Sequence, residues 1–168
     1  AKLRWLNGRW IRRTDEPDLV RRLRAEQLGD GYLIRVMELA RERIDTLEEF
    51  FSYAQFFFVG DVEYGDGAIR KMIAGERGAP QVAKGLRLLL EERLDPLLDW
   101  RAEVLEEALR SFSERQGWEI REFLMTVRVA VTGRPATPPL FETMEVLGKE
   151  ICRRRLRRAM ETLRSVKD

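Results

Sequence analysis

Apolar residues spaced three and four positions apart recur along the chain, and this spacing constrains the fold more than any other feature. It runs through residues 81–94, 102–112, 119–131 and 149–166. Such spacing gathers the apolar side chains on one face of an α-helix. Residues 127–131 alternate enough for a short strand, but the sequence offers no second strand for pairing, so a helix is predicted there as well. The sequence predicts an all-α protein with eight to ten helices.

The first part of the chain shows helical patterns broken by turn signals. Asn7-Gly8 predicts a turn or a helix end, and Pro17 predicts a helix start. Another helix is expected over 32–44. Thr46 and Glu49 form a capping-box pattern ahead of an aromatic segment. These signals predict short helices with frequent breaks.

Charge is distributed unevenly along the chain. Residues 1–24 hold eight Lys/Arg and three Asp/Glu, a net charge of +5, and residues 147–168 hold the same numbers. Because the whole chain carries +2, the middle must carry −8. Basic ends around an acidic centre suit contact with a phosphate-bearing partner at selected places. The alternative is that the arginine-rich helix faces are simply solvated.

The residue types needed for most catalysis are scarce. The chain has no histidine, and Cys152 is its one cysteine. These facts exclude a histidine base, an intrachain disulfide and a thiolate metal cluster, and Cys152 is expected to be a buried, inert thiol. The acidic loop at 61–67 fails the calcium-loop pattern, because the closing glutamate position holds Met72. The sequence predicts no catalytic or metal site.

The chain has no visible signal peptide and no apolar run long enough to span a bilayer. A cytoplasmic location without membrane contact is therefore expected. The sequence starts at Ala1, already inside a structured-looking motif, which predicts that it is a piece of something longer.

The four tryptophans divide into two pairs. Trp100 and Trp118 precede helical patterns and are expected to cover the core. Trp5 and Trp10 lie among cations instead, and aromatic rings interleaved with cations are typical of nucleic-acid surfaces. The residues expected to contact RNA at this end are Lys2, Arg4, Trp5, Arg9, Trp10 and Arg12.

The segment "RVAVTGRPATPPLFETMEVLGKE" (128–150) reads as a rigid corner between two helices. Gly133 permits a left-handed helix end, and Pro138-Pro139 start the next helix. Its apolar residues Phe141, Met144, Val146 and Leu147 are expected to lock that helix into the core.

This segment resembles the C-terminal part of bacterial glutamyl-tRNA synthetase, a class I aminoacyl-tRNA synthetase. The opening "KLRWLNGRWI", with Trp10 in place of the usual tyrosine, and "DTLEEFFSYAQFFF" resemble other parts of the same region. The resemblance implies a cage-like helical anticodon-binding domain over 76–168, preceded by a helical stem-contact or linking module over 1–75. It also implies a glutamate-accepting tRNA as the partner of a monomer.

The resemblance further implies that catalysis takes place elsewhere. The nucleotide-binding sheet of the family and its two signature motifs are absent, so ATP, Mg and glutamate would bind a catalytic domain of the same polypeptide outside this chain. No cofactor is expected within it. Two alternatives remain open: a freestanding helical RNA-binding or protein-docking module, and a structural fragment without RNA affinity.

Candidates for anticodon binding are long polar side chains in or beside helix breaks, and the arginines of the last helix. Arg77 and Arg134 rank first because side chains in turns are expected to be free to enter an RNA loop. The continuous arginine row of the last helix suits phosphates better than one base. The full set is Arg77, Gln81, Lys84, Arg134, Arg153, Arg154 and Arg157.

Overall fold

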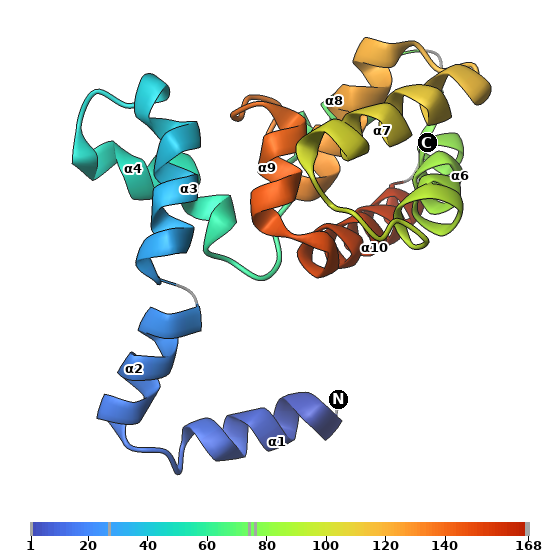
Figure 1. The fold of residues 1–168 in the computed structure, drawn as a ribbon. Helices are drawn as coiled ribbons and strands as arrows, with labels where there is room; N and C mark the ends of the chain where they lie inside the picture. Colours follow the sequence, from blue (N-terminus) through green and yellow to red (C-terminus); the bar gives the residue numbers. More distant parts are fainter. Residues whose placement is uncertain (1, 27, 74, 76, 167–168) are drawn as a thin grey trace. The chain divides into compact units, whose positions relative to one another are not determined.

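The computed structural model describes residues 2–26, 28–73, 75 and 77–166, without the side chains of residues 2–4 and 26. Within these residues it contains α-helices and no strand, as the apolar spacing predicts (Figure 1). Among them, no helix is both long and apolar enough to cross a membrane. The helices are α1 (Lys2–Ile11), α2 (Glu16–Glu26), α3 (Asp30–Ala40), α4 (Leu47–Ala54), α5 (Asp66–Met72), α6 (Ala79–Leu89), α7 (Ala102–Arg115), α8 (Ile120–Thr132), α9 (Leu140–Leu147) and α10 (Lys149–Ser165).

The chain divides into two compact units, residues 1–38 and 39–168. The division of roles expected at 75–76 concerns RNA contacts and stays a prediction. In the first unit the predicted turn at Asn7-Gly8 is wrong. Helix α1 passes through it, because the amide of Arg12 donates to the carbonyl of Gly8 at 3.2 Å and the helical ladder continues. Helix α2 begins beside Pro17, as predicted.

Helix ends near the start of the second unit differ from the expected ones. The helix predicted over 32–44 ends at Ala40 and tightens into a 3-10 turn, Arg41–Arg43. Helix α4 does begin after Thr46, but the Thr46 hydroxyl makes no capping bond. The Glu49 carboxylate instead accepts from the amide of Asp45 at 2.9 Å. Only the glutamate half of the capping box therefore forms, and its carboxylate accepts from the amide of Asp45 instead of that of Thr46.

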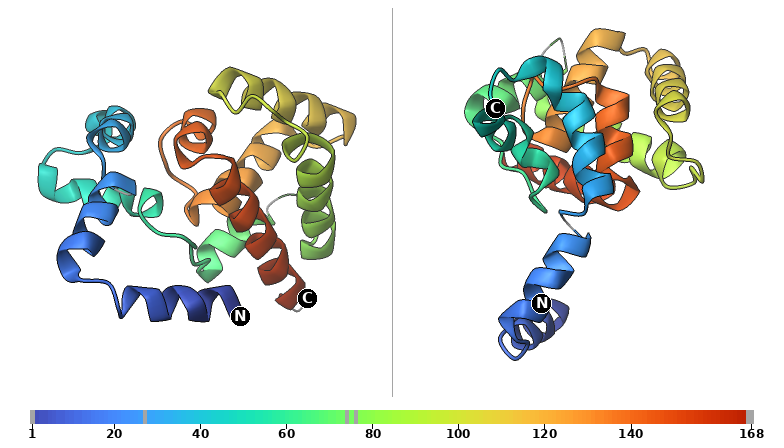
Figure 2. Two further views of the ribbon diagram at one scale, coloured as in Figure 1. Left: turned by 60° about the horizontal axis from the view of Figure 1, so that its bottom comes forward. Right: turned by 60° about the vertical axis from the view of Figure 1, so that its left-hand side comes forward.

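The second unit packs around α10 and α8. Helix α10 lies against α6 and α8, α5 lies on α8, and α7 lies on α9 (Figures 1 and 2). The helices meet over large apolar side chains with no exposed surface, such as Leu105, Phe112, Phe123 and Leu156. Burying each such side chain contributes about 1.5–3 kcal/mol before entropy is counted. This core fixes the positions of the polar side chains described below.

Gly133 ends α8 in the left-handed conformation, with φ of 73°, as the sequence predicts. Its amide donates to the carbonyl of Val129 at 2.8 Å. A Cβ at this position would lie 2.8 Å from the carbonyl oxygen of Glu63. Glycine is therefore required here for two reasons, the backbone angle and the close approach of a second segment.

Helix α9 follows Pro138-Pro139 and ends at Gly148, as the sequence predicts. Met144, Val146 and Leu147 are buried, in line with the expectation that they fix the helix in the core. The same expectation is wrong for Phe141, which is only half-buried. Phe141 lies in the first turn of this short helix and points partly outward, whereas Met144, Val146 and Leu147 cover the core.

Helix α6 continues into a π-helical turn, Leu90–Leu94, in which the amide of Asp95 donates to the carbonyl of Leu90 at 2.8 Å. The helix predicted to reach Leu94 therefore does so in a widened form. The Lys149 ammonium, at the start of α10, donates to the carbonyls of Asp95 and Leu97 at 2.8 and 2.6 Å. Lysine on these carbonyls fixes the turn against α10.

Candidate functional site

Arg155 of α10 has no exposed surface, and no local pattern in the sequence predicted a role for it. Its guanidinium donates to the carbonyls of Val131, Phe56 and Val59 at 2.6, 2.6 and 2.7 Å, and more weakly to that of Gly60. A buried charge is tolerated only when its donors are satisfied, and these carbonyls satisfy them. Arg155 thus joins the end of α8 to the segment that follows α4.

The neighbouring arginines of α10 bind the same segment, residues 56–62. Arg154 donates to the carbonyl of Gly60 and pairs with Asp61 at 3.0 Å. Arg158 donates to the carbonyl of Val62 at 3.2 Å. We call these three side chains, Arg154, Arg155 and Arg158, the arginine clamp. Of the three arginines predicted in the row of the last helix, Arg154 therefore contacts the protein's own backbone, and the role of the row in RNA binding stays a prediction.

Tyr64, just after this segment, supports the clamp. Its hydroxyl donates to the carbonyl of Ala130 at 2.7 Å and lies 3.1 Å from that of Arg155. Burial raises the pKa of Tyr64 well above its usual value. The phenol therefore stays protonated and remains a donor across the physiological pH range.

The other two arginines of the predicted row differ from each other. Arg153 donates to Asp95 at 2.6 Å and to Glu150 at 2.7 Å, and these hydrogen bonds raise the pKa of Arg153. Arg157 is exposed and has no hydrogen bond or ion pair within the part of the chain that the structure describes. Arg157 is thus the cation of this row best placed to meet an outside partner.

Arg77 is not a free side chain, contrary to the reason for ranking it first. Its guanidinium donates to the carbonyl of Gly117 at 2.6 Å and lies 4.4 Å from the ring centroid of Trp118. Trp118 is half-buried as expected and approaches α6 closely, because a Cβ on Gly85 would lie 2.6 Å from its ring. Gln81 and Lys84 remain exposed on α6.

Arg134 is held as well. Its guanidinium donates to the carbonyls of Ser52 and Tyr53 at 2.9 and 3.2 Å and to the amide oxygen of Gln55 at 3.2 Å. It caps the end of α4, where the last carbonyls of a helix favour a cation. The expectation that Arg134 is free is therefore wrong, while its role in anticodon binding stays a prediction.

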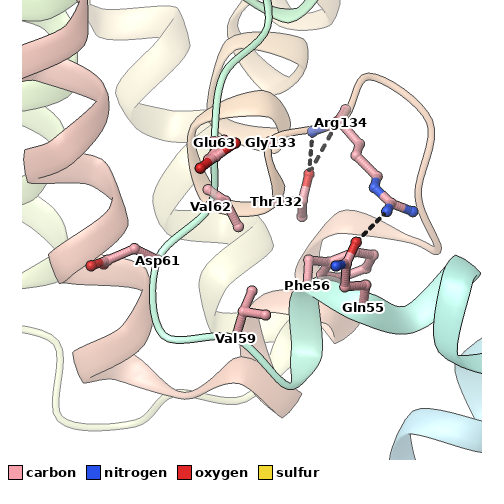
Figure 3. A pocket seen from close by; sticks show the side chains of 9 residues that line it. All are labelled: Gln55, Phe56, Val59, Asp61, Val62, Glu63, Thr132, Gly133 and Arg134. Carbon is pink, nitrogen blue, oxygen red and sulfur yellow. Dashed lines mark hydrogen bonds between the residues drawn. The ribbon is translucent and has the colours of Figure 1, made fainter.

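Arg134 borders a partly open pocket of about 420 Å³ (Figure 3). The pocket lies between the segment after α4 and the end of α8, and both of these belong to the second unit. Its lining residues are Gln55, Phe56, Val59, Asp61, Val62, Glu63, Thr132, Gly133 and Arg134. No signal in the sequence predicted this pocket, because its two walls are about 70 residues apart along the chain.

The turn between α8 and α9 is fixed by Arg128. Its guanidinium donates to the Thr137 hydroxyl and, at 2.7 Å, to the carbonyl of Pro138. Burial lowers the pKa of Arg128, which nevertheless remains charged at neutral pH. No local pattern in the sequence predicted this role for Arg128.

The aromatic and basic residues of α1 are exposed, as far as the structure describes them. Trp5 is 55% and Trp10 45% exposed. Arg9 lies 4.9 Å from the ring centroid of Trp5, and Arg22 of α2 lies 4.9 Å from that of Trp10. Arg12 is exposed, whereas the side chains of Lys2 and Arg4 lie outside the described residues. Aromatic rings paired with guanidinium groups suit contact with bases and phosphates.

Among the described residues, no group of histidine, cysteine or carboxylate side chains could hold a metal ion. Cys152 is fully buried, and burial raises its pKa to about 12, so this thiol is inert as predicted. The groups that remain available are cations, tryptophan rings and a small pocket. Such an arrangement can bind a large polyanion.

An all-α fold with exposed cations and tryptophan rings is typical of the class of helical nucleic-acid-binding modules. The comparison with protein families agrees: the model of the anticodon binding domain matches residues 16–160. The chain belongs to the anticodon binding domain family.

Similar proteins support this assignment. The chain is 36% identical over 167 residues to a glutamate–tRNA ligase of Thermus thermophilus, covering 95% of this chain and 34% of the relative. It is 35% identical to a glutamate–tRNA ligase of Thermobifida fusca, and the match covers 98% of this chain and 36% of the relative. The fold resembles a glutamate–tRNA ligase of Elizabethkingia meningosepticum, with a TM-score of 0.71 and 23% identity over 95% of this chain. The chain spans about a third of the length of the relatives it matches.

Proposed function

We propose that the chain is the tRNA-binding C-terminal region of a glutamate–tRNA ligase. The observation that carries the proposal is the family match over residues 16–160, together with 36% identity to a glutamate–tRNA ligase along 95% of the chain. The whole ligase would use ATP and Mg to activate glutamate and would attach it to its tRNA. This region would supply RNA binding, while its lack of histidine agrees with chemistry performed elsewhere.

Two kinds of contact would carry the binding. Residues 1 to about 75 would meet the tRNA stem through Arg9, Arg12 and the tryptophans of α1, and residues from about 76 would meet the anticodon end. Phosphate contacts would give affinity without sequence information, and splayed bases would give identity. The proposed partners are a glutamate-accepting tRNA and the catalytic domain of the same polypeptide, in a cytoplasmic monomer.

Filter binding of the 168-residue chain to a panel of tRNAs tests this function. The panel contains a glutamate-accepting transcript, variants that differ only in the anticodon, and unrelated tRNAs. We expect preferential binding of the glutamate-accepting transcript and weaker binding of anticodon variants. Equal affinity for every tRNA would favour a general RNA-binding module instead, and no binding at low salt would refute the proposal.

A catalytic assay completes the test. We expect the chain to show neither ATP–pyrophosphate exchange nor aminoacylation, because no histidine and no phosphate-binding loop are present in its sequence. Exchange that depends on this protein in a clean preparation would contradict the assignment of chemistry to another domain.

A further inference from the structure

The pocket beside Arg134 has an apolar floor and a polar end. Phe56, Val62 and Thr132 on its floor are each at most 5% exposed. In Figure 3 Val59 and Val62 form one side, and the side chains of Arg134 and Gln55 meet at the other. A volume of about 420 Å³ lies in the range of pockets that accept small organic groups.

The polar end presents hydrogen-bond donors. An arginine can only donate, so its bond to Gln55 fixes the glutamine oxygen toward Arg134 and turns the amide nitrogen outward. That nitrogen has no partner within the part of the chain that the structure describes. Arg134 uses one amino group on the carbonyls of Ser52 and Tyr53, so N–H groups on its other nitrogens remain. A group with acceptor atoms along one edge would satisfy these donors.

The other charges of the pocket disfavour a phosphate. Glu63 and Asp61 also border it, and both carboxylates are exposed. In Figure 3 the Asp61 side chain points away from Gln55. Its carboxylate pairs with Arg154 at 3.0 Å. Because Arg154 neutralises Asp61, the remaining charges of the lining are those of Glu63 and Arg134, which balance, so a neutral planar group suits the pocket better than an anion.

We propose that this pocket receives one unstacked base of the bound RNA. The base lies against Val59 and Val62, and its edge accepts hydrogen bonds from Gln55 and Arg134. Guanine presents two adjacent acceptor atoms, O6 and N7, along one edge, so it is a favoured base. The inference rests on the proposed function, since the RNA supplies the base, and it assigns a subsite to it.

The pocket is built to keep its shape without a ligand. The arginine clamp holds Phe56, Val59, Gly60 and Val62 through their carbonyls, and Gly133 lets this segment approach the end of α8. A preformed pocket needs little ordering when the base binds, so most of the energy of the contacts between base and pocket appears as affinity.

The test combines a protein variant with RNA lacking single bases. Gln55→Glu keeps an oxygen for Arg134 but removes the outward N–H donors. Its matched control is Gln116→Glu, the same exposed change at the end of α7. Helix α8 separates the two positions, and its 13 residues span roughly 20 Å. Dissociation constants are measured for a glutamate-accepting transcript and for a series with an abasic nucleotide at each position of the anticodon loop.

We expect the wild-type chain to lose roughly tenfold in affinity at one abasic position. Gln55→Glu should bind the intact RNA roughly tenfold more weakly and lose nothing further at that position, whereas Gln116→Glu should keep the wild-type profile. Val59→Phe, which fills the pocket with an apolar ring, should reproduce the Gln55→Glu profile. Thermal melting of all variants shows whether the fold is kept.

The outcomes separate this inference from the proposed function. Binding of tRNA with identical abasic profiles for wild type, Gln55→Glu and Val59→Phe overturns the base pocket, favours a non-RNA occupant, and leaves the proposed function standing. Failure of the wild-type chain to bind any tRNA overturns both.

Discussion

The guanidinium of Arg155 donates a 2.6 Å hydrogen bond to the carbonyl of Val131, although 24 residues separate the two along the chain. The bond is fully buried and forms where α8 approaches its end. The same guanidinium reaches back to Phe56 and Val59, so one side chain fixes three parts of the second unit.

Removing this side chain should destabilise the protein severely. Arg155→Met keeps an apolar stem of similar length but leaves the carbonyls of Val131, Phe56 and Val59 without their donor. We expect a loss of at least about 3 kcal/mol in the free energy of unfolding, measured by urea denaturation. The control is Arg157→Met, on the exposed face of α10, which should change the free energy of unfolding by less than about 0.5 kcal/mol. Equal midpoints for both variants would show that the buried bonds contribute nothing.

Gly133 should tolerate no side chain. Gly133→Val combines a left-handed backbone angle with a Cβ 2.8 Å from the Glu63 carbonyl oxygen, so we expect a loss of about 2–4 kcal/mol. The matched control is Gly67→Ala in α5, where a Cβ meets nothing within 4 Å. That change should be neutral or slightly stabilising. A melting temperature of Gly133→Val equal to that of the wild type would show that the corner between α8 and α9 does not require glycine.

The cations of α1 should contribute affinity without selectivity. Replacing Arg9 and Arg12 by alanine is expected to weaken binding of every tRNA by a similar factor, because phosphate contacts carry no sequence information. The slope of log K against log salt should fall by roughly 0.7–0.9 for each phosphate group that the variant no longer neutralises. An altered ranking of anticodon variants would contradict the stem-contact role proposed for α1.

Arg77 and Arg157 should respond differently in the same assay. If Arg77 contacts a base, Arg77→Ala should weaken the free energy of binding to tRNA with the cognate anticodon by about 1–3 kcal/mol. Binding to the anticodon variants should change little. Arg157→Ala should weaken binding of every tRNA by a similar factor, as removal of a phosphate-binding side chain does. Because Arg77 also packs on Trp118, tryptophan fluorescence of the free protein must be compared first. Uniform losses for both variants would remove Arg77 from the anticodon site.

Cys152 should report on unfolding. Burial raises the pKa of its thiol to about 12, against about 8.5 in an unfolded chain. The unfolded chain therefore releases the thiol proton at lower pH, and the free energy of unfolding should fall as pH rises from about 8.5 to 12. At pH 8 a thiol reagent should react only as fast as the protein opens. Rapid labelling of the folded protein would show that Cys152 is accessible.

The sequence predicts those features that depend on local spacing. Apolar residues at three- and four-residue intervals predict α7, α8 and α10. Gly133 predicts a left-handed helix end, because few residues other than glycine adopt the left-handed conformation. Arg155 escaped prediction because its partners are carbonyls up to 99 residues away, which no local pattern records. Arg134 and Arg77 were expected to be free because they lie in turns, yet a turn can also direct an arginine onto its neighbours. The pocket depends on the same long-range contacts.

The arginine clamp also sets an order of events during synthesis. The segment from Phe56 to Val62 leaves the ribosome long before Arg155, and its carbonyls must wait for residues made 99 positions later. At about 5–20 residues per second this delay is roughly 5–20 s. During that time the segment between α4 and α5 lacks the hydrogen bonds that the arginines of α10 supply. Helix α10, which closes the second unit, is therefore translated after every segment that its arginines hold.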